Sequence, residues 1–201
     1  MRVLRESSLG EYAEWYLQRE AVKGSTRSIP DSSEQMIQEM RNFHEGKMRG
    51  WFDELTRWHI VELNLIGDLQ TLVFLESKWT KETGLVIPSG ANYRILDQVG
   101  KNAIASHYLE GLEPTAKHTT YYDSLMKGSM KLAGADRIAI CTAEPSEIAS
   151  NPAASYYLLD GVGRCLPYMI LLQQRKREFA AIEAFRAERN PNEAPQLFNR
   201  R

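Results

Sequence analysis

The chain has 201 residues, with 25 Lys or Arg against 26 Asp or Glu, so its formal net charge is −1. This balance argues against the broadly basic surface that nucleic-acid-binding domains carry, and a nucleic-acid partner is not expected. The 43 % hydrophobic and 25 % charged residues are typical of a globular protein and exclude a disordered chain.

Cysteine usage and hydropathy indicate the cellular compartment of the protein. Cys141 and Cys165 lack the spacing of a zinc site, and two cysteines are too few for a disulfide framework. We interpret both as buried free thiols, which suit a reducing cytoplasm. The chain starts without an apolar signal core, and no run of about 18 apolar residues occurs. A cytoplasmic protein without a membrane span is predicted.

Residues 1–57 are predicted to form an N-terminal helical extension. Ser7 or Ser8 caps a first helix, and Asp31 or Ser32 caps a second. The second helix has apolar residues at helical spacing: Met36, Ile37, Met40 and Phe43. The aromatic side chains of this region include Trp15, Trp51 and Trp58. They either cover a sheet or form the surface of a homodimer.

Residues 58–189 are predicted to form the main domain. The alternation over 58–65 indicates its first strand. Apolar spacing over 69–79 and 91–108 favours helices. Residues 190–201, which contain two prolines, are predicted to be a loose tail.

The last third of the main domain alternates helix and strand. A short helix over 121–127, capped by Thr119 or Thr120 and ended by Gly128, precedes a strand over 137–142. Residues 143–154 are expected to be a loop. Near the end of the domain, residues 179–189 fit either a helix or a final strand.

The stretch on which the functional prediction depends lies between the loop over 143–154 and the segment over 179–189. An apolar run from Tyr156 stops at Asp160-Gly161, crosses a turn that ends in Gly163-Arg164, and enters a second apolar run. We interpret it as strand, tight turn and helix. Two glycines let another molecule approach the backbone, and the first N–H groups of a helix beside an arginine bind anions. The alternative is an ordinary strand-to-helix turn with a structural arginine.

This order of elements resembles the ParB/sulfiredoxin superfamily. The matching residues are 124–128, 137–142 and 156–164, so the resemblance covers about 119–175. Residues 60–65 correspond to the opening strand of that family. The resemblance implies an α+β fold with a small mixed sheet of the ParB/sulfiredoxin type, covered by helices.

The resemblance also implies a nucleotide site, because the Gly-x-x-Arg turn holds phosphates in that superfamily. Gly161 and Arg164 match the motif, with Gly163 between them in the same turn. Asp160 matches the ParB-like free-serine kinases, and Ser124 falls where sulfiredoxins place a nucleotide-contacting serine. The implied cofactor is ATP or another nucleotide with Mg²⁺.

The chain departs from the family at chemically important positions. Val162 occupies the position of the reactive cysteine of sulfiredoxins, so sulfiredoxin chemistry is disfavoured. Val162 and Gly163 also replace the histidines that precede the arginine in sulfiredoxins and in the kinases. The doubled arginine of ParB partition proteins is missing as well.

Several residues are candidates for chemistry at the turn. Glu62 or His118 is a candidate general base, although a strand-surface carboxylate and an exposed loop histidine are the alternatives. Asp160 is the candidate ligand of Mg²⁺, or else a turn residue that bonds the backbone. Lys117 and Lys127 either add charge near a phosphate or are solvated.

Two functions remain open at the level of sequence. The first is a protein that binds a nucleotide or phosphorylated small molecule, with phosphoryl transfer or phosphodiester hydrolysis as the possible reaction. The second is a non-enzymatic, degenerate ParB-like module that acts through a protein partner.

Overall fold

The computed structural model describes residues 1–22, 29–43, 51–75, 93–142 and 156–189. Seven strands form one sheet in the order β1-β2-β7-β5-β6-β3-β4. The strands are β1 (Arg2–Ser7), β2 (Arg57–Leu63), β3 (Val73–Leu75), β4 (Tyr93–Ile95), β5 (Ile138–Thr142), β6 (Tyr156–Asp160) and β7 (Ile182–Glu188). The helices are α1 (Leu9–Val22), α2 (Ser33–Phe43), α3 (Ile66–Gln70), α5 (Leu96–Ala105), α6 (Lys117–Lys127), the 3-10 turn η2 (Gly134–Asp136) and α8 (Val162–Gln173).

The sheet mixes both strand directions. β2 is antiparallel to β1 and β7, and β5 is antiparallel to β6. β7 runs parallel to β5, and β3 runs parallel to β6 and antiparallel to β4. A mixed sheet packed with helices confirms the predicted α+β class.

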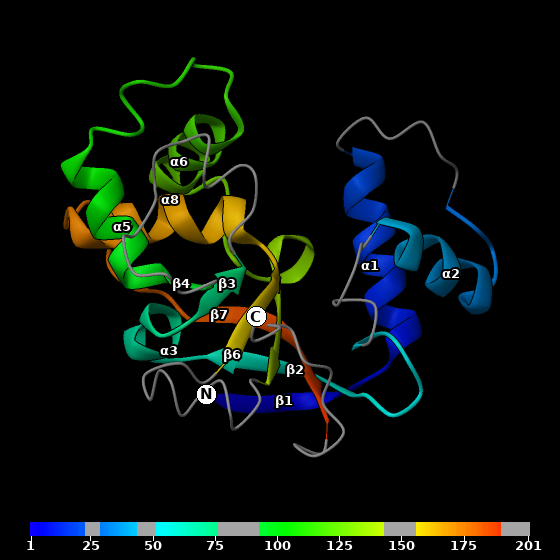
Figure 1. The fold of residues 1–201 in the computed structure, drawn as a ribbon. Helices are drawn as coiled ribbons and strands as arrows, with labels where there is room; N and C mark the ends of the chain where they lie inside the picture. The colour runs from blue at the N-terminus through cyan, green and yellow to red at the C-terminus, as the bar shows by residue number, and fades with distance from the viewer. Residues whose placement is uncertain (23–28, 44–50, 76–92, 143–155, 190–201) are drawn as a thin grey trace, which may run out of the picture.

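Helices cover both faces of the sheet, so the molecule has three layers (Figure 1). One core lies between the sheet and helices α3, α5, α6 and α8. The second core lies between the opposite face and helices α1 and α2. The strands alternate accordingly: in β2, Val61 and Leu63 enter the first core, whereas Trp58 and Ile60 enter the second.

The second core is aromatic, and the N-terminal helices complete it. Trp15, Trp51 and Trp58 are 8 %, 0 % and 3 % exposed, so all three tryptophans are buried within it. Tyr12 of α1 stacks on Trp58, with ring centroids 4.5 Å apart. Of the two alternatives for these tryptophans, the structure therefore supports the one in which they cover the sheet.

Most of the predicted elements are confirmed. The helices at α1, α2 and α8 and the strands at β2, β5 and β6 lie where their patterns indicate. The helix predicted over 121–127 is present as α6, but it begins four residues earlier, at Lys117. The predicted cap at Thr119 or Thr120 is therefore wrong, because both lie inside the helix and Ala116 occupies the N-cap position. The ambiguous stretch over 179–189 is a strand, β7, which lies between β2 and β5. The loop predicted over 143–154 and the tail over 190–201 lie outside the described residues.

Three short strands were not predicted. β1, in a segment without a predicted element, forms one edge of the sheet. The helix predicted over 69–79 is wrong at 73–75, which is strand β3, and the helix predicted over 91–108 begins only at Leu96, after strand β4. Residues 76–79 lie outside the described ranges.

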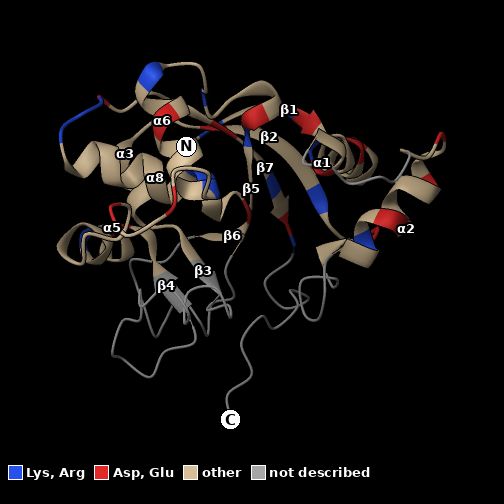
Figure 2. Ribbon diagram, turned by 90° about the horizontal axis from the view of Figure 1, so that it is seen from above, with Lys and Arg blue, Asp and Glu red and all other residues tan. Residues whose placement is uncertain are grey.

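Charged residues of both signs are intermixed over the described elements, as Figure 2 shows. None of the helices in the described part of the chain combines the length and apolar character that a membrane crossing requires.

Candidate functional site

The turn between β6 and α8 requires glycine at its first position. Gly161 has φ +112°, a backbone conformation that other residues rarely adopt. A Cβ atom at this position would lie 2.7 Å from Cγ2 of Ile138 on the neighbouring strand β5. Both the conformation and the close approach therefore exclude a side chain here.

This turn presents the N-terminus of α8. The Gly161 carbonyl accepts the N–H groups of Arg164 and Cys165 at 2.9 and 2.8 Å. The amides of Val162 and Gly163 precede those donors and have no acceptor within the helix. The partial positive charge of the helix N-terminus therefore falls at Val162 and Gly163.

Arg164 is buried at this turn, with only 1 % of the residue exposed. Its Nη2 donates to Oδ2 of Asp160 at 3.0 Å and to the Arg137 carbonyl at 2.9 Å. Its buried Nε has no acceptor within the described part of the chain. The side chain ties the turn to the end of β6 and to the start of β5, and it adds positive charge beneath the turn.

A second arginine comes from the opposite layer. Arg19 of α1 forms an ion pair with Asp160, and its guanidinium lies 4.8 Å from the centre of the Trp15 ring. Asp160 therefore accepts hydrogen bonds from both Arg19 and Arg164. The single carboxylate of Asp160 neutralises only part of the positive charge of the two guanidinium groups.

A cleft of about 150 Å³ lies above the turn. Its wall combines a basic side chain from α1, two side chains from α6 and the turn itself: Arg19, Lys117, Tyr121, Leu159, Asp160, Gly161, Val162, Gly163 and Arg164. The volume admits a phosphate group and is too small for a whole nucleotide.

Lys117 places its ammonium group directly beside the first turn of α8. A Cβ atom built on Gly163 would lie 3.0 Å from Cε and 3.4 Å from Nζ of Lys117. The absence of a side chain at Gly163 thus makes room for the lysine. The amine also lies 5.8 Å from the centre of the Tyr121 ring. Helix N-terminus and ammonium together present positive charge to the cleft, an arrangement suited to an anion.

The predicted turn residues meet at this cleft, whereas the predicted bases lie elsewhere. Glu62 forms an ion pair with Arg2 at 3.0 Å, on a strand separated from β6 by β7 and β5. Three strand spacings correspond to about 14 Å.

His118 belongs to the core on the other side of α6. It is 5 % exposed, and its Nδ1 lies 2.9 Å from the Tyr108 hydroxyl. Burial and the charge of Lys117 lower its pKa to about 4. His118 is therefore a neutral core residue at neutral pH and does not line the cleft.

Ser124 lies near the opposite end of α6 from Lys117, and its carbonyl accepts hydrogen bonds from Ser129 and Met130. Seven residues along a helix correspond to about 10 Å. Ser124 is not among the described residues that line the cleft.

The cleft does not fit a magnesium ion held by the protein. Asp160 is the one carboxylate among its described lining residues, and two arginines already bind it. Mg²⁺ prefers several oxygen ligands, including carboxylates that are not paired with cations. Within the described ranges, no group of three or more His, Cys, Asp or Glu residues comes together.

Both cysteines are free and buried, as the sequence predicts. Burial, and to a smaller extent the charge of Asp160, raises the pKa of the Cys165 thiol well above its ordinary value. Cys165 therefore remains a protonated core residue of α8, and thiolate chemistry beside the turn is disfavoured.

Arg19 is the site residue that the sequence does not reveal. It lies more than 100 positions from the turn motif and reaches Asp160 only because α1 packs on the sheet. Arg19 follows Trp15 by four residues, so both lie on one face of α1. This spacing was the available sequence signal that Arg19 faces the sheet.

Comparison with known proteins adds no relative. No protein-family model matches the chain, and no curated protein or solved structure matches it at a significant level. The assignment of a function therefore rests on the residues of the cleft and on the motif at the β6–α8 turn.

Proposed function

We propose that this chain is a ParB/sulfiredoxin-like protein that binds the phosphate of a nucleotide or another phosphorylated small molecule in the cleft above Gly161–Arg164. The observation that carries the proposal is the position of Lys117, whose ammonium group lies beside Gly163 at the N-terminus of α8. A phosphate between them accepts hydrogen bonds from the first amides of the helix and from the lysine.

Arg164 supports the anion from below and does not contact it. Because it is buried and donates to Asp160 and to the Arg137 carbonyl, its task is to fix the turn. Arg19 stands at the edge of the cleft and is the second basic side chain within reach of the ligand. The remainder of a nucleotide extends outside the small cleft, where Tyr121 offers an aromatic face.

Binding without catalysis is the form of the proposal that the geometry favours. Glu62 and His118 lie away from the described cleft, and Asp160 is paired with two arginines. No described residue of the cleft is thus a ready general base.

A phosphotransferase or phosphodiesterase is the second candidate. It is favoured by the Asp-Gly-x-x-Arg turn, which resembles that of the ParB-like kinases. In that case Mg²⁺ enters as the complex with the nucleotide phosphates, because the cleft holds no metal site of its own.

Amide NMR spectroscopy tests the binding proposal. Inorganic phosphate, ADP, ATP and CTP, each with and without Mg²⁺, are titrated while the signals of Val162 and Gly163 are followed. We expect saturable shifts at both amides and none at Gly67, which lies in α3. Unchanged Val162 and Gly163 signals with all four compounds would contradict the proposal. Phosphorus NMR of the ATP sample distinguishes binding from turnover.

A further inference from the structure

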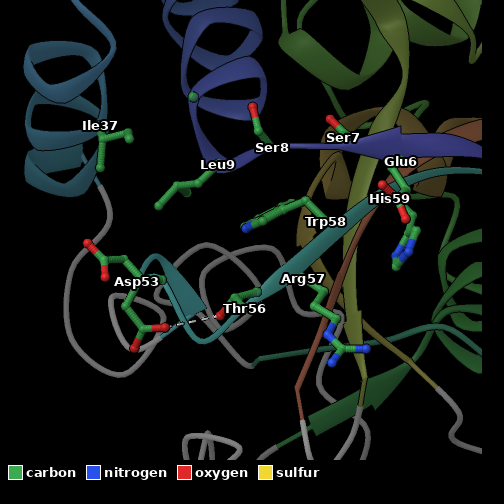
Figure 3. A pocket seen from close by; sticks show the side chains of 12 residues that line it. Glu6, Ser7, Ser8, Leu9, Ile37, Asp53, Thr56, Arg57, Trp58 and His59 are labelled. Carbon is green, nitrogen blue, oxygen red and sulfur yellow. Dashed lines mark hydrogen bonds between the residues drawn. The ribbon is translucent and has the colours of Figure 1, made fainter.

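A second cavity, larger than the cleft above the β6–α8 turn, lies beside the aromatic core. It measures about 540 Å³ and opens where β1 passes into α1, between α2 and the segment that leads into β2 (Figure 3). This volume lies within the range of small-molecule sites, which is roughly 300–1,000 Å³.

The indole N–H of Trp58 is an unused donor in the wall of this cavity. Trp58 is 3 % exposed, and its Nε1 has no hydrogen-bond acceptor among the residues that the structure describes. Figure 3 shows the indole nitrogen directed toward the space beside Leu9. A buried indole normally finds a partner, since leaving such a donor unpaired costs roughly 1–3 kcal/mol. Nε1 itself is closed to solvent, so an acceptor in the adjoining cavity reaches it only when the side chains beside the indole edge shift slightly.

The indole is held in a fixed orientation. Tyr12 stacks on it at 4.5 Å with an interplanar angle of 16°, and Phe52 lies 6.2 Å away at 12°. A donor that does not reorient loses little entropy when a ligand binds. The donor is therefore preorganised.

The remaining wall is apolar where the ligand body would lie. Leu9 of α1 and Ile37 of α2 face the same space as the indole edge (Figure 3). Both side chains are partly buried in the aromatic core. They provide the surface that an apolar ring requires.

The charges around the cavity disfavour an ionic ligand. Asp53 is neutralised by an ion pair with Arg189 and accepts the Leu55 N–H at 3.0 Å. The exposed rim carries both signs of charge, with acidic side chains at Glu6 and Glu54 and a basic one at Arg57, so it selects neither an anion nor a cation. This cavity is thus chemically distinct from the phosphate cleft.

We propose that this cavity binds an uncharged small molecule whose apolar ring packs on Leu9 and Ile37 and whose carbonyl oxygen accepts the hydrogen bond of Trp58 Nε1. The proposal is independent of the phosphate cleft, with which the cavity shares no lining residue.

The indole N–H signals of the four tryptophans provide the test. Benzamide and acetophenone serve as carbonyl-bearing probes, and toluene is the matched probe without an acceptor. We expect both carbonyl probes to shift the Trp58 indole proton downfield with saturation, and toluene to cause a smaller shift. The Trp15 indole, which donates to the Ala135 carbonyl at 3.1 Å, serves as the internal reference.

Ile37→Phe fills the cavity from α2 and should abolish the Trp58 shift while the fold is retained. Sequential assignment of the wild-type protein identifies the Trp58 signal, so the test does not depend on a tryptophan variant that fails to fold. The proposal is overturned if neither carbonyl probe shifts the Trp58 signal at millimolar concentration. It is also overturned if Trp15 responds equally or if the Ile37→Phe protein responds like the wild type.

Discussion

Arg164 donates a hydrogen bond to the carboxylate of Asp160 at 3.0 Å, so the two charged residues of the turn motif bind each other. The same guanidinium donates to the Arg137 carbonyl on the neighbouring strand connection. The motif therefore supports the proposed anion site indirectly: it fixes the end of β6 and the start of α8, beside which Lys117 lies.

Replacing Arg164 should destabilise the fold. Arg164→Met removes a buried cation from two acceptors, and we expect the free energy of unfolding to fall by about 2–4 kcal/mol. Urea denaturation measures the change. Arg2→Met removes an exposed arginine from its pair with Glu62 and should cost less than about 1 kcal/mol. Equal losses in both variants would refute the structural role of Arg164.

The glycine at the start of α8 should tolerate no side chain. Gly161→Ala combines a positive φ with a contact of 2.7 Å to Ile138, and we expect a loss of about 2–4 kcal/mol. In Gly67→Ala the new methyl group meets no atom within 4 Å, so stability should stay the same or rise slightly. Thermal unfolding of both proteins compares the two positions. A Gly161→Ala protein as stable as the wild type would show that the turn geometry is wrong.

A substitution at Gly163 should weaken phosphate binding without unfolding the protein. Gly163→Ala adds a methyl group 3.0 Å from Cε of Lys117, at a helical position where alanine is the better residue. The lysine side chain can move, so the fold should be retained while phosphate binding weakens several-fold. Calorimetric titration with ATP measures the affinity, and circular dichroism checks the fold. Unchanged affinity would place the ligand elsewhere.

His118 should make stability depend on pH. Its pKa is lowered by burial to about 4, below the value near 6.5 expected in the unfolded chain. The unfolded state therefore binds the proton first, and the stabilisation present above pH 6.5 is lost as the pH falls toward 4. The loss from this residue is about 3 kcal/mol.

The variant His118→Asn keeps a hydrogen-bonding side chain and does not titrate. Its urea midpoint should fall less steeply than that of the wild type between pH 6.5 and 4. Parallel pH profiles for the two proteins would show that His118 is accessible to protons in the folded state.

Local patterns predict the fold well where one face of an element is buried. The glycine turn, α8 and the strands β5 and β6 have clear periodicity and end signals, and all were predicted. β1 escaped prediction because five of its six residues are exposed at the sheet edge, so no alternation develops. β3 escaped because its three residues owe their conformation to pairing with β6 and β4.

The site was predictable only in its local part. Asp160, Gly161, Gly163 and Arg164 are neighbours in sequence and therefore lie together at the junction of β6 and α8. Arg19 reaches that turn through the packing of α1 across the sheet, which no local pattern encodes.

The most direct test of the phosphate cleft is calorimetric titration of ATP into the wild type, Lys117→Met and Lys101→Met. Lys101 is an exposed lysine of α5 that pairs with Asp97 and serves as the matched control. Loss of a charge-assisted hydrogen bond should weaken binding roughly 10- to 100-fold in Lys117→Met, with Lys101→Met close to the wild type. Equal affinity in all three proteins, or no binding to the wild type, would contradict the cleft as the phosphate site.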